Sequence, residues 1–195
     1  MFLGYKGILF AAAAAVCFLN VNAVSITELS EITDPDGVYE LSSDIVLDES
    51  FVQLGTEQAP FTGSFDGNGF TITVNGTSPF GFVKNAELSD FAVSGVVSSK
   101  ENFGGIVGSA EGATTIKNCS FSGTLDSCGE GIVISAGGIA GTVGSEASVI
   151  NCSSNVSLTC EKLPYLLNAG GISGRNQGTV SQCASSGELS VISEK

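Results

Sequence analysis

The chain has 195 residues, a formal net charge of −13, no histidine and no tryptophan. This acidity argues against nucleic acid or an anionic membrane surface as a partner, because both attract clusters of Lys and Arg. Without histidine the chain lacks the usual general base at neutral pH and the commonest metal ligand, so we expect no cofactor and no metal site.

The first 23 residues have the order of a signal peptide. Lys6 supplies the positive charge, residues 8–19 form an apolar run, and residues 21–23 (VNA) are a cleavage site of small residues. The alternative is an N-terminal membrane anchor, but the apolar run is short for a membrane span. We therefore expect a protein that begins at Val24 after cleavage, is secreted or displayed at the cell surface, and is no longer inserted in the membrane.

Residues 24–59 are predicted to form an N-terminal cap together with the first strands. Residues 34–37 (DPDG) have the composition of a turn, and they lack the spacing of a calcium loop. The segment 38–48 is a strand candidate. Residues 70–74 alternate apolar residues with threonine, which predicts a strand, and a tight turn at Asn68-Gly69 precedes them.

Three later segments repeat one pattern at a fixed stride. Each contains Gly-Gly-Ile, and the triplets begin at Gly104, Gly137 and Gly170, which are 33 residues apart. Such a period indicates stacked copies of one supersecondary unit. The copies lack helical spacing and are rich in Gly, Ser, Thr and Val, so each is predicted to hold two or three short strands. A propeller of the WD40 type fits less well, because the chain has no tryptophan. The copies span 103–125, 136–158 and 169–189.

Alignment of the copies gives four apolar columns that we expect to face the core. The cysteine column lies three residues after another column, an odd offset, so a bend or bulge is predicted at Lys117–Asn118. Residues 79–97 extend the pattern as a degenerate coil, with Phe91 in the cysteine column. The columns are Ile106/Ile139/Ile172, Ile116/Val149/Val180, Cys119/Cys152/Cys183 and Leu125/Leu158/Leu189.

These patterns predict an all-β chain, a parallel β-helix (β-solenoid) of about four to five coils over residues 60–195 behind the N-terminal cap. The segments GSFDGNGFTI (63–72) and GFVKNA (81–86), with the repeated GGI-x-G and NC, resemble the GLUG-repeat proteins. That resemblance covers roughly residues 38–189. It implies a right-handed β-helix in a secreted or surface protein whose repeats are not catalytic.

The cysteines divide into two groups. Six are present, and Cys17 leaves with the predicted leader. The cysteine column is expected to hold reduced, buried thiols, because stacked strands keep the Cβ atoms about 4.8 Å apart, beyond the spacing that a disulfide prefers. Cys128 and Cys160 follow in corresponding loops where the backbone can adjust, so they are the predicted disulfide.

Four Asn-x-Ser/Thr sequons are candidate glycosylation sites. Asn75, in the predicted turn Asn-Gly-Thr, and Asn155 are the predicted acceptors. Asn118 and Asn151 align at the predicted bend, where a stack of asparagine side chains would complete backbone hydrogen bonds.

The sequence predicts a non-catalytic protein. A glycosidase needs two carboxyls that face one groove, and the aspartates of this chain form no recurring cluster. We expect an adhesive, binding or structural module for a protein or a glycan on an extracellular surface. The alternatives are a rigid spacer or self-assembling fragment of a larger surface protein and, third, a carbohydrate-active enzyme. An exposed aromatic cluster would favour glycan binding, and a carboxylate-lined groove would favour the enzyme.

Weak self-association through the C-terminal coil is also expected, because few residues follow Leu189 to cover it.

Overall fold

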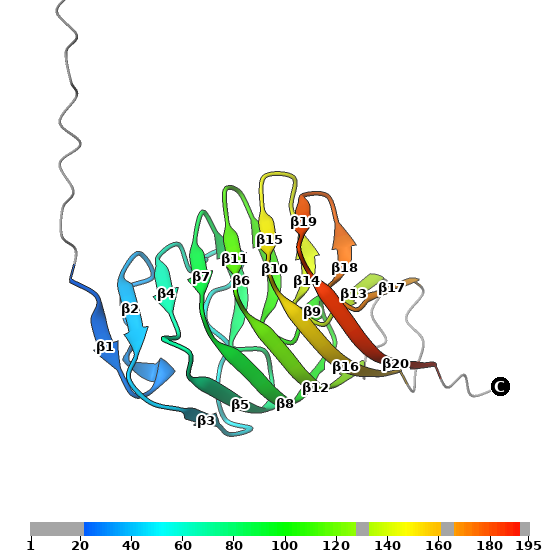
Figure 1. The fold of residues 1–195 in the computed structure, drawn as a ribbon, viewed down its shortest axis with the longest axis horizontal. Coiled ribbons are helices and arrows are strands. Elements are labelled where there is room, and N and C mark those ends of the chain that lie inside the picture. Colours follow the sequence, from blue (N-terminus) through cyan, green and yellow to red (C-terminus); the bar gives the residue numbers. More distant parts are fainter. Residues whose placement is uncertain (1–21, 128–132, 161–165, 192–195) are drawn as a thin grey trace, which may run out of the picture.

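Four parallel β-sheets wrap around one apolar core in this computed structural model, which describes residues 22–127, 133–160 and 166–191. Figure 1 shows the coils side by side along the long axis of the molecule, from β1 at one end to β20 at the other. The order of strands makes the fold a β-solenoid of about five coils, as the repeat predicts. The predicted signal peptide covers residues 1–23, of which 1–21 lie outside the described residues.

The four sheets, here named A to D, are built from short strands. Sheet A contains β1 (Val24–Ile26), β2 (Val38–Leu41), β4 (Ser64–Asp66), β7 (Glu87–Ser89), β11 (Thr115–Lys117), β15 (Ser148–Ile150) and β19 (Thr179–Ser181). Sheet B contains β3 (Ile45–Leu47), β5 (Thr71–Gly76), β8 (Ala92–Ser99), β12 (Ser120–Ser127), β16 (Ser153–Cys160) and β20 (Ala184–Val191). Sheet C contains β6 (Phe80–Lys84), β10 (Val107–Glu111), β14 (Ala140–Val143) and β18 (Ser173–Asn176), and sheet D contains β9 (Phe103–Gly104), β13 (Val133–Gly137) and β17 (Leu166–Gly170).

Each full coil passes through the sheets in the order A, B, D, C, so one repeat holds four strands rather than the predicted two or three. The additional strand arises because β13 and β17 pair with each other over five residues each, beginning before the Gly-Gly-Ile triplet. The register confirms the alignment of the columns, since Ile116 pairs with Leu88 on one side and Val149 on the other. Residues 79–97 therefore contribute a coil in the same register, with strands in sheets C, A and B and none in sheet D.

The apolar columns face the core in the first two copies and emerge in the third. Ile106 and Ile139 are fully buried, whereas the exposed fraction of Val180 is 36% and that of Leu189 is 58%. The same column positions differ because each earlier coil lies between two neighbours, while no described coil covers β19 and β20. The inward assignment of these columns is thus confirmed, and burial of the last copy is not.

The N-terminal half of the core is aromatic. The ring of Phe65 lies 5.3 Å from that of Phe80 and 5.3 Å from that of Phe91, both in edge-on contact. Phe91 occupies the cysteine column of its coil, as predicted, and is almost fully buried. A phenylalanine ring buries more apolar surface at this position than a thiol would.

Residues 24–59 contain β1, the 3-10 helix η1 (Leu29–Glu31), β2 and β3. Because β1 pairs in parallel with β2, this segment continues sheet A. The carboxylate of Glu31 accepts hydrogen bonds from the backbone N–H groups of Thr27 (2.8 Å) and Glu28 (2.9 Å), which fixes η1 at this end of the solenoid. The backbone N–H of Asp36 donates to Oδ1 of Asp34, so residues 34–37 form a turn, as their composition predicts.

Candidate functional site

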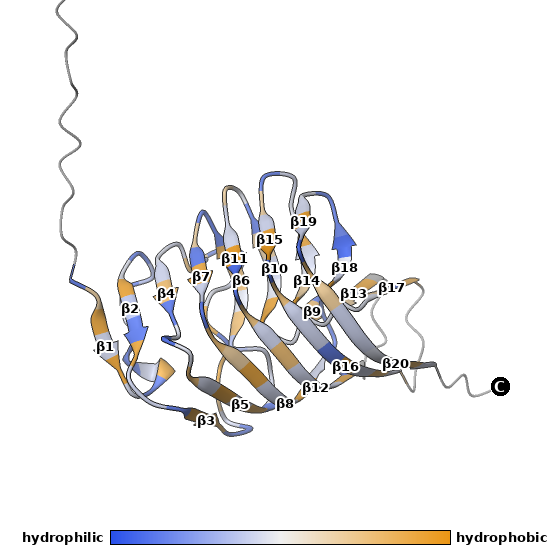
Figure 2. Cartoon of the chain, in the orientation of Figure 1, coloured by the Kyte–Doolittle hydropathy of each residue, from blue (hydrophilic) through white to orange (hydrophobic). Residues whose placement is uncertain are grey.

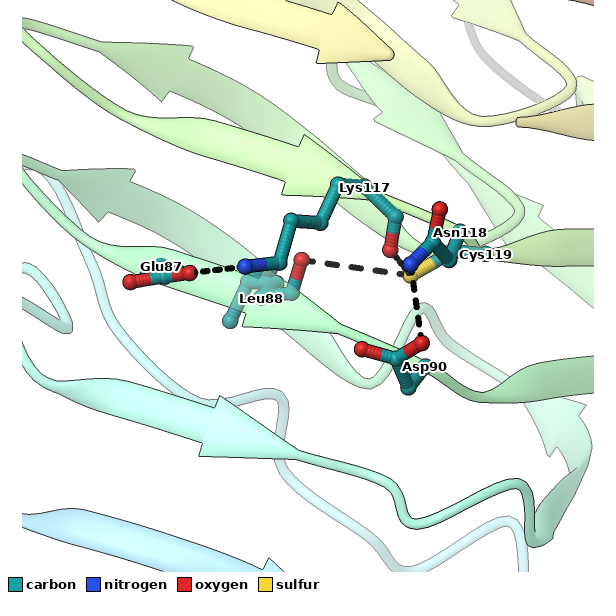
Figure 3. A network of polar contacts seen from close by, with 6 residues as sticks. All are labelled: Glu87, Leu88, Asp90, Lys117, Asn118 and Cys119. Carbon is teal, nitrogen blue, oxygen red and sulfur yellow. Dashed lines mark hydrogen bonds and ion pairs between the residues drawn. The ribbon is translucent and has the colours of Figure 1, made fainter. Parts of the chain in front are cut away.

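The corner between sheets A and B carries a ladder of polar side chains. Asp90, Asn118 and Asn151 take the left-handed backbone conformation there, with φ of 60°, 53° and 52°. The side-chain amide of Asn118 donates to Oδ1 of Asp90 over 2.9 Å, a contact drawn in Figure 3. Asn and Asp tolerate this conformation better than other non-glycine residues, and the bend predicted at Lys117–Asn118 is confirmed. The ladder is a structural device of the corner.

The cysteine column lies directly inside this corner. The thiol of Cys119 donates to the carbonyl oxygen of Lys117 over 3.1 Å, and the thiol of Cys152 donates to that of Ile150 over 3.3 Å. All three column cysteines are free thiols, as predicted. Burial raises the pKa of Cys119 well above its ordinary value, so its thiol stays protonated at neutral pH and is a poor nucleophile.

Cys183 departs from the prediction that the whole column is buried. It is half-buried, because its coil has no described neighbour on the outer side. The predicted Cys128–Cys160 disulfide stays a prediction: Cys160 is fully buried, whereas Cys128 lies outside the described residues.

Two sequons lie on one face of the solenoid. Asn75 on β5 and Asn155 on β16 are both exposed, and both point out from sheet B. The placement of Asn75 in a turn was wrong, since it pairs with Val96 inside a strand. β5 extends to Gly76 because Asn75 and Gly76 pair with Val96 and Val97 of β8. Use of either site stays a prediction.

A polar groove of about 750 Å³ lies over the outer face of sheet C. Its floor is a row of four residues on successive strands, paired in register: Phe82, Ser109, Thr142 and Arg175. The first three are half-buried and Arg175 is exposed. Figure 2 shows that β18, which carries Arg175, is hydrophilic. The row presents an aromatic ring, two hydroxyls and a guanidinium along one line.

Two loops border this groove. The segment 53–58 continues sheet C beyond β6, because the backbone N–H of Gly81 donates to the carbonyl oxygen of Leu54 over 2.7 Å. The segment 100–102 lies on another side, where Oδ1 of Asn102 accepts from the backbone N–H of Ser135 over 2.9 Å. Hydrogen bonds to neighbouring strands therefore hold the borders as well as the floor.

Glycines of the repeat let the Asn102 segment approach the sheet. A Cβ on Gly108 would lie 2.5 Å from the carbonyl oxygen of Gly81 and 3.0 Å from that of Asn102. A Cβ on Gly141, one coil later, would lie 2.6 Å from the backbone nitrogen of Phe103. Any side chain at these positions would push the border away from the floor. The third glycine of the first two GGI-x-G patterns thus permits the close approach of residues 102–103 to sheet C.

The charges in the groove are unusual for so acidic a chain. Among the described basic residues, Lys117 forms an ion pair with Glu87 at 2.5 Å, which raises the pKa of Lys117. Lys100 and Arg175 form no ion pair with the described carboxylates, and both line the groove. Carboxylates also line it, namely Glu57, Glu101 and Glu111.

Sequence reasoning did not assign the groove. Its residues come from separate segments of the chain, and only the fold brings Gln53, Lys100 and Arg175 to one place. The alignment of Ser109, Thr142 and Arg175 at one variable repeat position was the available signal for the floor.

Within the described ranges, no three His, Cys, Asp or Glu side chains are grouped as a metal site. Nor does this part of the chain contain a helix with the length and apolarity to cross a membrane.

Comparison with known proteins is consistent with this fold. Residues 101–126 match the GLUG motif. A crystal structure of a "putative immunoglobulin A1 protease" from Bacteroides ovatus is similar to the chain, with a TM-score of 0.62 and 21% sequence identity. The similarity covers 80% of this chain and 56% of that one, so this chain spans little more than half of its structural neighbour. No curated protein matches the sequence. The chain is therefore a β-solenoid that carries the GLUG motif, and its resemblance to the GLUG-repeat proteins is confirmed.

Proposed function

We propose that this protein is a non-catalytic binding module of the cell exterior, and that its ligand surface is the groove over sheet C. The observation that carries the proposal is the groove itself: about 750 Å³, with polar lining side chains on a floor of four hydrogen-bonded strands. A rigid floor lowers the ordering cost of binding, which is the advantage of a solenoid as a recognition surface. The ligand is a protein or a glycan.

The lining bears on the choice between a binding module and an enzyme. One aromatic ring, Phe82, lies in the floor, and the amides of Gln53, Gln58 and Gln177 line the groove. The three glutamates of the groove keep a carbohydrate-active enzyme as the alternative, because glycoside hydrolysis uses paired carboxyls. Two of them, Glu57 and Glu101, are exposed on loops. Neither therefore lies in a buried, apolar pocket of the kind that holds the acid of a glycosidase. The neighbour's name gives no support for proteolysis, since the likeness concerns the fold.

The test is a binding screen of the secreted protein against glycan and host-protein arrays, with release of reducing sugar measured in parallel. Thr142→Trp fills the centre of the floor, and Ser122→Trp places the same bulk on the exposed face of sheet B. We expect Thr142→Trp to abolish binding and Ser122→Trp to preserve it. Ligand that binds both variants equally would place the binding surface elsewhere. A protein that binds nothing would favour the spacer function, and sugar release would favour the enzyme.

Export is part of the same proposal, and it rests on the leader in residues 1–23. The described chain is ordered into β1 from Val24 onward, directly after the proposed cleavage site. N-terminal sequencing of secreted protein should therefore begin at Val24. Secreted protein that retains Met1 would overturn cleavage.

A further inference from the structure

The charges of the groove point to a ligand class within the proposed function. We propose that the groove over sheet C binds an acidic oligosaccharide, one with a single carboxylate sugar among neutral, hydroxyl-rich sugars, and that Arg175 and Lys100 receive the carboxylate. This inference rests on the proposed function and specifies its ligand. Its starting point is the pairing of charges across the described chain.

Carboxylates greatly outnumber cations in this protein, 20 against 7, yet of the four described basic residues only Lys117 forms an ion pair. Two of the other three, Lys100 and Arg175, line the groove, whereas Lys84 does not. Arg175 is the chain's single arginine. It is exposed at the end of the floor row, and within the described residues its side chain has neither an ion pair nor a hydrogen bond. A guanidinium presents its donors in a planar fork that matches a carboxylate, so this end of the groove suits a carboxylate ligand.

The remaining lining suits sugar hydroxyls. The hydroxyls of Ser109 and Thr142 lie in the floor, and the amide of Asn102 keeps its two N–H donors free of the described protein while its oxygen accepts from Ser135. Glu57 and Glu101 supply acceptors only. A sugar hydroxyl can donate to a carboxylate and accept from an amide, so a neutral sugar uses both kinds of group.

The length of the floor fits an oligosaccharide better than a single sugar. Four strands carry the row from Phe82 to Arg175, which are three strand spacings apart, or about 14 Å at ~4.8 Å each. The half-buried ring of Phe82 offers an apolar face at the end opposite the guanidinium. A chain of sugars can thus place one ring against Phe82 and its carboxylate sugar at Arg175.

The same groove disfavours an acidic peptide and a polyanion. Peptides commonly gain affinity by pairing with a free strand edge. The central floor strands β10 and β14 are each paired on both sides, so among the described floor strands only β18, at the Arg175 end, offers such an edge. Three glutamates against two cations leave the lining with a net negative charge, which repels a ligand with closely spaced anionic groups. An oligosaccharide with one carboxylate needs no free strand edge, and its single negative charge can lie beside the cations and away from the glutamates.

Titration calorimetry with sialyllactose and with lactose tests this inference on the secreted protein. We expect sialyllactose to bind at least about tenfold more tightly than lactose, with the difference reduced at high salt. Arg175→Gln should weaken sialyllactose by about ten- to hundredfold, the range of a charge-assisted hydrogen bond, and leave lactose unchanged. Lys100→Gln should act in the same direction. Lys84→Gln is the matched control, because Lys84 is exposed and without an ion pair on β6 but does not line the groove.

The outcomes separate the ligand class from the function. Equal affinity for the two sugars, or an unchanged sialyllactose affinity in Arg175→Gln, would overturn the acidic ligand and leave the binding module in place. The acidic-oligosaccharide ligand would also be overturned by a glutamate-rich peptide that binds more tightly than sialyllactose and whose binding is lost in Thr142→Trp. Binding of neither sugar, together with no array ligand lost in Thr142→Trp, would overturn the proposed function itself. Equal urea midpoints of Arg175→Gln and the parent protein establish that a loss of binding is not a loss of fold.

Discussion

The side-chain amide of Asn151 donates to Oδ1 of Asn118 over 2.8 Å, across one full repeat of 33 residues. Asn118 in turn donates to Asp90, so three successive coils are linked at the same corner. Each of these side chains both turns its own backbone and bonds the coil next to it. Asn118 therefore performs two tasks, the turn of its own backbone and the link between coils, and substitutions can distinguish them.

Asn118→Gly and Asn118→Ala separate those two tasks. Glycine accepts the left-handed φ of 53° but removes both ladder hydrogen bonds, and we expect a loss of about 1–2 kcal/mol in the free energy of unfolding. Alanine also loses the bonds and in addition carries a Cβ that disfavours this conformation, which costs about 1–2 kcal/mol more. Urea unfolding measures both. Equal stability of the two variants would mean that the backbone conformation contributes nothing.

The repeat predicted most of the fold because its columns depend on neighbouring coils of the same chain. Ile116 and Val149 lie in register in the structure as they do in the alignment. The position of Asn75 was missed because strand length there is set by β8, a partner that local turn chemistry does not reveal. The groove was missed for a related reason: Gln53 and Arg175 are far apart in sequence and meet only after the coils stack.

Ile139→Asp is expected to be far more destabilising than Thr142→Asp. Ile139 is fully buried, with a coil on either side, so the substitution buries a carboxylate without a partner and should cost more than about 4 kcal/mol. Thr142 points outward and is half-buried, and its substitution should cost less than about 1 kcal/mol. Urea midpoints compare the two variants, and coincident midpoints would contradict the inward assignment of the isoleucine column.

Thiol labelling should follow burial along the cysteine column. Cys183 is half-buried at the last described coil, while Cys119 and Cys152 are almost fully buried. Burial raises the pKa of both Cys119 and Cys183, so fewer thiolates are present at neutral pH than at an ordinary cysteine, and labelling should accelerate as the pH rises. We expect native protein to label at Cys183 first, and at the other two only on unfolding.

Peptide mass mapping after alkylation in denaturant without reductant shows which of the cysteines are free thiols and which are joined in a disulfide. All three column thiols should be labelled, and Cys128 should be recovered joined to Cys160. A bond between Cys119 and Cys152 would contradict the column, since it would require their stacked strands to shift. Rapid native labelling of Cys152 would mean that the last coil opens in solution.

The last described coil is the surface at which we expect weak self-association. Leu189 and Val180 occupy core columns there and yet are 58% and 36% exposed, and the outer backbone edge of β20 has no described partner strand. Such an edge favours pairing with another chain. The net charge of −13 opposes it, so association should be weak at low salt and increase as salt screens the repulsion. Sedimentation of the secreted protein across a salt and concentration series measures this.

Leu189→Lys should lower the association constant, whereas Val96→Lys, on the exposed outer face of sheet B, should not. A protein that stays monomeric throughout the series, or an equal effect of the two lysines, would show that the last coil is not the contact surface.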